Sequence, residues 1–337
     1  MKNVCFLIIY SFLILKGNAA TNSYDYTSYN AQSTNTNLSG ETITSITAGE
    51  SAVYITSSGI TISDSTIEKS GDISSSNVEN SEFYGINAAV LIQGGSLTIN
   101  NGKITTSAKG GNAVCAINNG EVTISGTTIT STGSASARGL HATYGGKITA
   151  SDATISSTGG SCATLATDRG EGTVSCTGCT LSTEGAGSPL IYSTGDITVS
   201  NSSGTASGAQ MVVVEGKNSA TVQNSSLKGT GIGNREESGE KIDSCGIFLY
   251  QSMSGDADTG TSKFNCKDST HEILSSSSVY SSAPMFFVTN TDSSINLENC
   301  SFNYGSGTFL KAAGTSAWGT SGSNGGEVTF NFNKSKY

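Results

Sequence analysis

The chain is poor in the side chains that most metal and redox sites use. It has 2 His, 1 Trp and 2 Pro among its 337 residues, and charged residues make up only 13%. Zinc sites usually combine two pairs of Cys or His ligands, and the motif Cys176-x-x-Cys179 has no second pair because neither His141 nor His271 lies at a partner spacing. No helix is expected to follow the motif, as thioredoxin-like chemistry would need. The sequence therefore predicts no metal site and no cofactor.

Acidic residues are dispersed along the chain. Polysaccharide lyases and hydrolases need clustered carboxylates to hold calcium or to act as acid and base. The acids of the regular region fall in different parts of different repeats: Asp152, Asp168, Glu171, Glu184 and Asp196. The run from Asp168 through Arg169 to Glu171 comes nearest to a charged constellation, and we expect a solvated turn with a local ion pair. No catalytic set is predicted.

The net charge of −9 limits the partners. Nucleic acids and anionic membrane surfaces both need basic patches, so neither is expected to bind. Acidic polysaccharides are also disfavoured unless calcium bridges the two. A neutral glycan or a cell-surface or extracellular protein remains as the expected partner, and the sequence gives no indication of an oligomeric state.

What the chain does contain is an internal repeat. Six similar three-residue segments, each with apolar first and third residues, begin 25, 26, 26, 23 and 23 residues apart, at Leu97, Val122, Ile148, Val174, Ile197 and Ala220. In most units an apolar residue follows five positions after the last residue of this segment. A Gly-rich turn then leads to a third short apolar segment. Such units cannot bury an apolar face alone, so they must stack. The pattern predicts an all-β fold, a single-stranded parallel β-helix with coils of about 23–26 residues.

The repeat also suggests the domain boundaries. Residues 1–20 have the charged start, apolar run and small-residue end of a secretory signal peptide, so we expect a secreted or cell-surface protein without a membrane span after its removal. Residues 21–40 form a Ser, Asn and Tyr-rich leader or an N-terminal cap. The β-helix domain covers 41–337, with regular coils at 60–230, an insertion around 73–77, and loop insertions at 231–243 and 252–263.

Seven cysteines remain after the signal peptide. Four of them occupy inward-facing apolar positions of the repeat: Cys176 and Cys266 share one position, and Cys179 and Cys300 share another. Cys266 and Cys300 flank one bend on neighbouring coils, which makes them candidates for a disulfide in an oxidising compartment. A bond between Cys176 and Cys179 is a tighter candidate. Buried free thiols that fill small slots are the alternative for all of them. Glycosylation sequons begin at Asn37, Asn201, Asn224, Asn299 and Asn333.

Hydroxyl side chains recur at the positions that should face outward. In each first strand the residue between two apolar ones points to solvent, which gives the row Thr61, Thr98, Thr123, Thr149, Ser175, Thr198 and Thr221. A second row follows the fifth-position apolar residue, at Thr105, Thr130, Ser156 and Ser182. The rows form flat ladders that either support neighbouring strands or dock on an ordered surface such as a glycan or ice. They do not form a strict doubled Thr-x-Thr on one face, which weakens the ice interpretation.

The run Gly120-Glu121-Val122-Thr123-Ile124-Ser125-Gly126 through Gly133, followed by residues 137–146, resembles the passenger repeats of autotransporter adhesins and other pectin-lyase-like surface proteins. The resemblance covers roughly residues 60–230. Together with the usual hand of parallel crossovers, it implies a right-handed β-helix. It also implies an adhesin or an extended display at a cell surface. The chain departs from such passengers by lacking a C-terminal barrel and by carrying seven mature cysteines.

These observations favour a non-enzymatic, adhesin-like rod that binds a glycan or a surface partner. The outward hydroxyl rows are the candidate binding residues. One alternative is a carbohydrate-active lyase or hydrolase with its site in the C-terminal loops. The other is an ice-binding protein that uses its Thr ladders.

Overall fold

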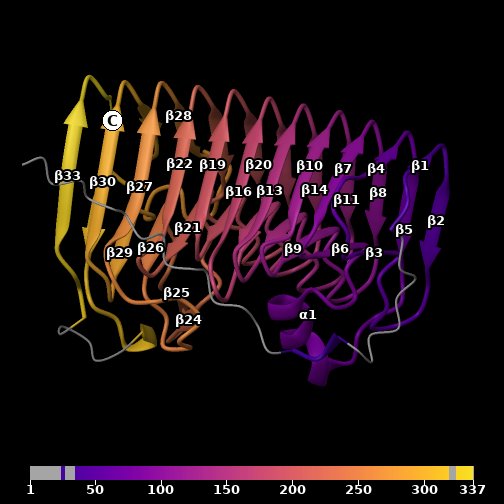
Figure 1. Cartoon of the computed structure of the whole chain (residues 1–337). Helices are drawn as coiled ribbons and strands as arrows, with labels where there is room; N and C mark the ends of the chain where they lie inside the picture. Colours follow the sequence, from indigo (N-terminus) through magenta and orange to yellow (C-terminus); the bar gives the residue numbers. More distant parts are fainter. Residues whose placement is uncertain (1–23, 27–34, 319–323, 337) are drawn as a thin grey trace, which may run out of the picture.

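Each coil contributes one strand to each of three parallel sheets, except that the last strand adds to one sheet alone, and the coils stack into a rod (Figure 1). The structure is a computed structural model that describes residues 24–26, 35–318 and 324–336. The signal peptide predicted at 1–20 lies outside the described residues. The predicted fold class, a parallel β-helix, is confirmed.

Successive strands belong to the three sheets in a fixed order, which defines the first, second and third sheets. The first sheet has the strand order β1 (Leu38–Ser39), β4 (Ile60–Ser63), β7 (Ser96–Asn100), β10 (Glu121–Ser125), β13 (Gly146–Ser151), β16 (Gly172–Thr177), β19 (Asp196–Ser200), β22 (Ser219–Gln223), β27 (Ser262–Lys267), β30 (Ser293–Glu298) and β33 (Val328–Asn333). The second sheet has β2 (Thr42–Ser45), β5 (Thr66–Lys69), β8 (Lys103–Thr106), β11 (Thr128–Ser131), β14 (Thr154–Ser157), β17 (Thr180–Thr183), β20 (Ser203–Ala206), β23 (Ser226–Gly229), β28 (Thr270–Ile273) and β31 (Ser301–Asn303). The third sheet has β3 (Val53–Ile55), β6 (Val90–Gln93), β9 (Val114–Ile117), β12 (Leu140–Ala142), β15 (Leu165–Thr167), β18 (Ile191–Ser193), β21 (Val212–Glu215), β26 (Ile247–Tyr250), β29 (Phe286–Thr289) and β32 (Leu310–Ala312).

The three-residue apolar segments of the repeat stack in register along the inside of the rod. Val122 pairs with Leu97 on one side and with Ile148 on the other, and the next coil continues the row with Val174. All four side chains are buried, because alternate residues of a strand face the same side. A continuous column of Val, Ile and Leu therefore forms the core, as stacked repeats require.

The corner between the first and second sheets explains the recurring Asn, Asp and Gly. One residue per coil takes a left-handed backbone conformation there, for example Asn101, Gly126, Asp152 and Gly178. Short polar residues and glycine adopt this conformation at the lowest cost. At the same corner the Ser202 hydroxyl accepts the Cys179 N–H of the preceding coil at 2.9 Å. Side-chain oxygens thus satisfy backbone groups that the bend would otherwise leave unpaired.

Three insertions depart from the regular coils, and all leave the rod next to the third sheet. Between β5 and β6 the chain forms a 3-10 turn at Ser75–Asn77 and the helix α1 (Val78–Tyr84). Residues 231–243 carry the antiparallel hairpin β24 (Glu236–Glu237) and β25 (Glu240–Lys241), and a third insertion precedes β27, which begins at Ser262. Figure 1 shows α1 and the hairpin on the same side of the rod. A further 3-10 turn, Ser316–Trp318, follows β32.

Two tyrosines of the leader lie against the helix α1. The first strand begins at Leu38, before the boundary expected at residue 41. Upstream of it, the Tyr24 ring stacks on Tyr84 at 4.8 Å, and the Tyr26 hydroxyl donates to the Tyr84 carbonyl at 2.7 Å. Tyr26 also packs on the outward-facing cluster that contains Leu91 and Cys115.

Candidate functional site

The predicted hydroxyl rows lie where the alternation of the strands places them. Register pairs join every member of the first row, from Thr61 to Thr221, on the outer face of the first sheet. The second row, Thr105 to Ser182, is aligned in the same way on the second sheet. None of these side chains is buried. The rows thus form ladders on two faces of the rod, and their role as a binding site stays a prediction.

The structure adds two details to these rows. On the second sheet, Thr128 and Thr154 stand beside Thr130 and Ser156 in adjacent outward positions, so a second hydroxyl column adjoins the row there. Ser156 interrupts the pattern, so the array is not a strict Thr-x-Thr, as expected. On the first sheet, the row continues past Thr221 with Asn265, Asn296 and Asn331. Sequence analysis missed these asparagines because the insertions hide the register, although each stands between two apolar residues as Thr does earlier.

A cleft lies on the outer face of the third sheet, beside the hairpin insertion. It has a volume of about 360 Å³. Its lining side chains come from β18, β21 and β26, the segments just before β18 and β21, the hairpin insertion and the 3-10 turn after β32: Pro189, Tyr192, Gln210, Val213, Asn234, Arg235, Asp243, Phe248, Tyr250 and Trp318. Sequence analysis placed a candidate site in the loops around 231–243, but it did not identify the strand residues that form the floor.

Two tyrosines of the floor share one buried carboxylate. The hydroxyls of Tyr192 and Tyr250 both donate to Oε2 of Glu215, at 2.6 and 2.7 Å. Burial, together with the nearby Glu215, raises the pKa of both phenols well above 10. Both tyrosines therefore remain neutral hydrogen-bond donors, and their rings are held in fixed positions over the sheet.

Aromatic packing and one aspartate fix the other wall. The Phe248 ring stacks on Tyr250 with centroids 4.6 Å apart and touches Trp318 at 5.3 Å. Asp243 accepts the backbone N–H groups of Asn234 and Arg235 at 3.0 and 2.9 Å, which holds the start of the hairpin insertion. The exposed side chains of Asn234 and Arg235 are thereby directed to the rim of the cleft.

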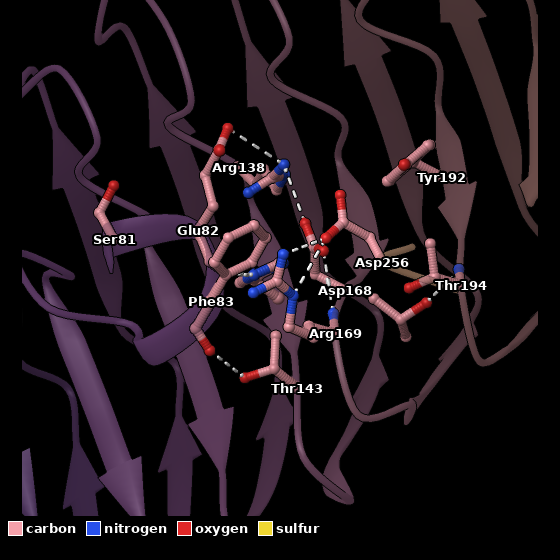
Figure 2. A network of polar contacts seen from close by, with 12 residues as sticks. Ser81, Glu82, Phe83, Arg138, Thr143, Asp168, Arg169, Tyr192, Thr194 and Asp256 are labelled. Atoms are coloured by element: carbon pink, nitrogen blue, oxygen red, sulfur yellow. Dashed lines mark hydrogen bonds and ion pairs between the residues drawn. The ribbon is translucent and has the colours of Figure 1, made fainter. Parts of the chain in front are cut away.

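A buried charge network borders this cleft on the side of α1. Figure 2 shows Arg138 between Glu82 and Asp168, with Nη2 at 3.4 Å from Glu82 Oε1 and 3.2 Å from Asp168 Oδ2. Burial raises the pKa of Asp168 to about 7, and Arg138 opposes that shift. Arg169 forms an ion pair with Asp256 of the third insertion. The expected solvated turn with a local ion pair at Asp168 and Arg169 is therefore wrong, because each residue pairs with a different segment.

The same network fastens α1 to the rod. Arg169 stacks over Phe83, with Cζ at 3.8 Å from the ring centroid. Three successive helix carbonyls accept donors from two neighbouring coils, namely Asn112 to Ser81 at 3.0 Å, His141 to Glu82 at 2.6 Å and Thr143 to Phe83 at 3.0 Å. Burial lowers the pKa of His141 to about 3, so the imidazole is neutral and donates through Nε2.

The cysteine and sequon candidates also have defined positions. Cys176 is bonded to Cys179, and Cys266 is bonded across neighbouring coils to Cys300, with Cα atoms 6.2 and 6.4 Å apart. Three other cysteines are free and buried: Cys115, Cys162 and Cys245. All five sequon asparagines, Asn37, Asn201, Asn224, Asn299 and Asn333, are exposed.

Within the described ranges, no group of three or more His, Cys, Asp or Glu side chains is arranged to hold a metal ion. No helix in the same part of the chain is long and apolar enough to cross a membrane. Comparison with known proteins found no matching family model, no matching curated protein and no matching solved structure.

Proposed function

We propose that this chain is a secreted or cell-surface adhesion rod that binds a neutral glycan in the third-sheet cleft without cleaving it. One observation carries the proposal. The cleft combines partly exposed tyrosine rings with the amide of Asn234 and the guanidinium of Arg235 in one small concave site. A sugar ring presents C–H faces and hydroxyls together, so it suits aromatic rings beside neutral and cationic donors.

The carboxylates around the cleft favour binding over hydrolysis. Glycoside hydrolysis needs two carboxyl groups that flank the scissile bond and exchange protons with it. Here Asp243 accepts two backbone N–H groups, Glu215 accepts two phenols, and Asp168 is paired with Arg138. All three are buried. Their hydrogen bonds shape the site, which supports a positioning role for each of them.

Three of the sequons lie where an exported chain could carry glycans. Asn201, Asn224 and Asn299 occupy the exposed left-handed corner between the first and second sheets. A glycan there would project from the rod without displacing any core residue. The signal-like segment at 1–20 and the two disulfides are consistent with an oxidising extracellular location.

A panel of immobilised neutral glycans, namely a β-glucan, a mannan and a galactan, tests the proposal. The purified chain should bind at least one of them and release no reducing ends. N234A/R235A should weaken that binding at least tenfold, because it removes exposed cleft donors without touching the core. T98V/T123V/T149V, on the first sheet, is the matched control and should bind as wild type does. New reducing ends, or full binding by N234A/R235A, would contradict the proposal.

Docking on an ordered surface is the second candidate, because of the doubled hydroxyl row on the second sheet. T128V/T154V/T180V removes three hydroxyls from that row and keeps the β-branched shape that strands favour. If the row binds ice, the wild-type chain should slow ice growth in a supercooled solution and this variant should not. Equal growth rates with wild type, variant and buffer would exclude this candidate.

A further inference from the structure

A groove on the first sheet is separate from the third-sheet cleft. It crosses the strands β22, β27, β30 and β33 and has a volume of about 540 Å³. One wall is the end of the outward row, Thr221, Asn265, Asn296 and Asn331, and we call this feature the amide groove. The earlier coils carry small Thr and Ser at these positions, so longer side chains create the walls here.

The asparagines of this wall form a hydrogen-bonded ladder. Asn265 donates to the Thr221 hydroxyl at 3.2 Å, Asn296 donates to Asn265 at 2.9 Å, and Asn331 donates to Asn296 at 2.7 Å. Each amide has two N–H donors and an oxygen with two lone pairs. The ladder uses one donor of each asparagine, and Asn296 also donates to the Ser294 hydroxyl at 3.4 Å. The second donors of Asn265 and Asn331 and the acceptor lone pairs of the ladder remain available to a ligand. They repeat once per coil, about every 4.8 Å.

The opposite wall contributes no net charge. Lys267 and Glu298 lie on it as an exposed ion pair, with Nζ and Oε1 3.1 Å apart. The ladder itself is neutral. A strongly anionic or cationic chain would therefore have to break this pair, whereas a neutral chain would leave it intact.

We propose that the amide groove binds a neutral polysaccharide chain running along the rod, one sugar residue per coil. One hexose ring of an extended chain advances by close to one coil spacing, so successive hydroxyls would meet successive amides. An extended peptide advances about 3.3 Å per residue and would fall out of step within a few coils. The backbone groups of β22, β27 and β30 are paired on both sides within the sheet, so only the edge strand β33 could accept an added peptide strand. Such a strand would lie across the rod beside β33 and not along the amide groove.

This site lies on a different sheet and does not depend on the proposed function of the third-sheet cleft. If both sites act, one rod holds two chains or two parts of one chain. A polymer long enough to reach both sites would then bind more tightly than either site alone accounts for.

The test uses a soluble neutral β-glucan polymer and its disaccharide as probes, with affinity measured by calorimetry. The starting protein is N234A/R235A, which isolates the groove from the cleft. Adding N265T/N296T/N331T restores the residue that the same row carries in earlier coils, so folding should be preserved. We expect affinity for the polymer to fall about a hundredfold, since three hydrogen bonds each worth about a factor of five are lost.

Adding T98V/T123V/T149V instead, in the same row but outside the groove, should leave the affinity unchanged. Binding should also vary little with salt and be much weaker for the disaccharide than for the polymer. The proposal is overturned if N265T/N296T/N331T binds as tightly as its parent, if the parent does not bind the glucan, or if an extended polar peptide displaces the polymer. Because the amide groove would still bind the glucan in N234A/R235A, the effect of these two substitutions on the cleft is measured in the N265T/N296T/N331T background. A loss of binding there bears on the proposed function and leaves the groove result independent.

Discussion

Replacing Arg138 by Met should expose how much the buried charge network stabilises the rod. Arg138 is buried between the carboxylates of Glu82 and Asp168. Removing one partner from a buried ion pair leaves an uncompensated charge and typically costs about 3–5 kcal/mol. We expect that loss at pH 8, where Asp168 is ionised in the wild-type chain.

The cost should depend on pH with a defined sign. The folded pKa of Asp168, about 7, is above the ordinary value of 3.8 for this side chain. The stability that the protonated carboxyl contributes is therefore fully present below pH 3.8 and is lost as pH rises through about 7. Without Arg138 the pKa should rise further, so at pH 5 the carboxyl of R138M is neutral. The loss at pH 5 should shrink to about 1–3 kcal/mol, the cost of a neutral polar group without a partner together with the lost contact to the partly exposed Glu82.

Urea unfolding followed by circular dichroism at pH 5 and pH 8 measures both values. The matched control is K228M, which removes an ion pair with Glu272 on a partly exposed surface, where about 0–1 kcal/mol is expected at either pH. D168N should abolish the decline in stability between pH 4 and 7. A loss below 1 kcal/mol in R138M, or an equal loss at both pH values, would refute a buried, titrating pair.

Three further predictions concern the rod itself. Burial lowers the pKa of Lys69 from 10.5 to about 8, so the unfolding free energy should rise between pH 8 and 10.5 in wild type and stay flat in K69M; the same slope in both would contradict this. G159A should destabilise by a few kcal/mol, because an added Cβ would collide with the Gly133 carbonyl, whereas thermal melts should show G160A near wild type, where the nearest atom is 3.5 Å away. Reducing the Cys266–Cys300 disulfide opens a 34-residue span and should cost about 4 kcal/mol, as chemical denaturation of C266A/C300A can test.

The coil pattern could be predicted because one face of every strand is buried. Val122 and Ile124 alternate with Thr123, and the same alternation recurs at a fixed interval, so period and facing direction together determine the stacking. The outward rows follow from the same alternation. The asparagine continuation was missed because an insertion of variable length breaks the interval between Thr221 and Asn265, although the local alternation persists.

The cleft and its charge network could not be predicted from the repeat. Glu82, Arg138 and Asp256 are far apart in the sequence and meet because three insertions or turns fold over one sheet. Periodicity contains no information on where an irregular segment packs. The local run at Asp168 and Arg169 did mark the location, but it suggested pairing between neighbours, since sequence shows adjacency and does not show burial.

Hydrogen exchange of the amides with and without a bound neutral oligosaccharide tests the central claim most directly. If the third-sheet cleft binds the glycan, protection should increase at residues 187–192 and 231–243, and the sugar should be recovered intact. Protection limited to the hydroxyl rows around Thr98 to Thr149, or recovery of a cleaved product, would contradict the account of a non-enzymatic rod that binds glycan in this cleft.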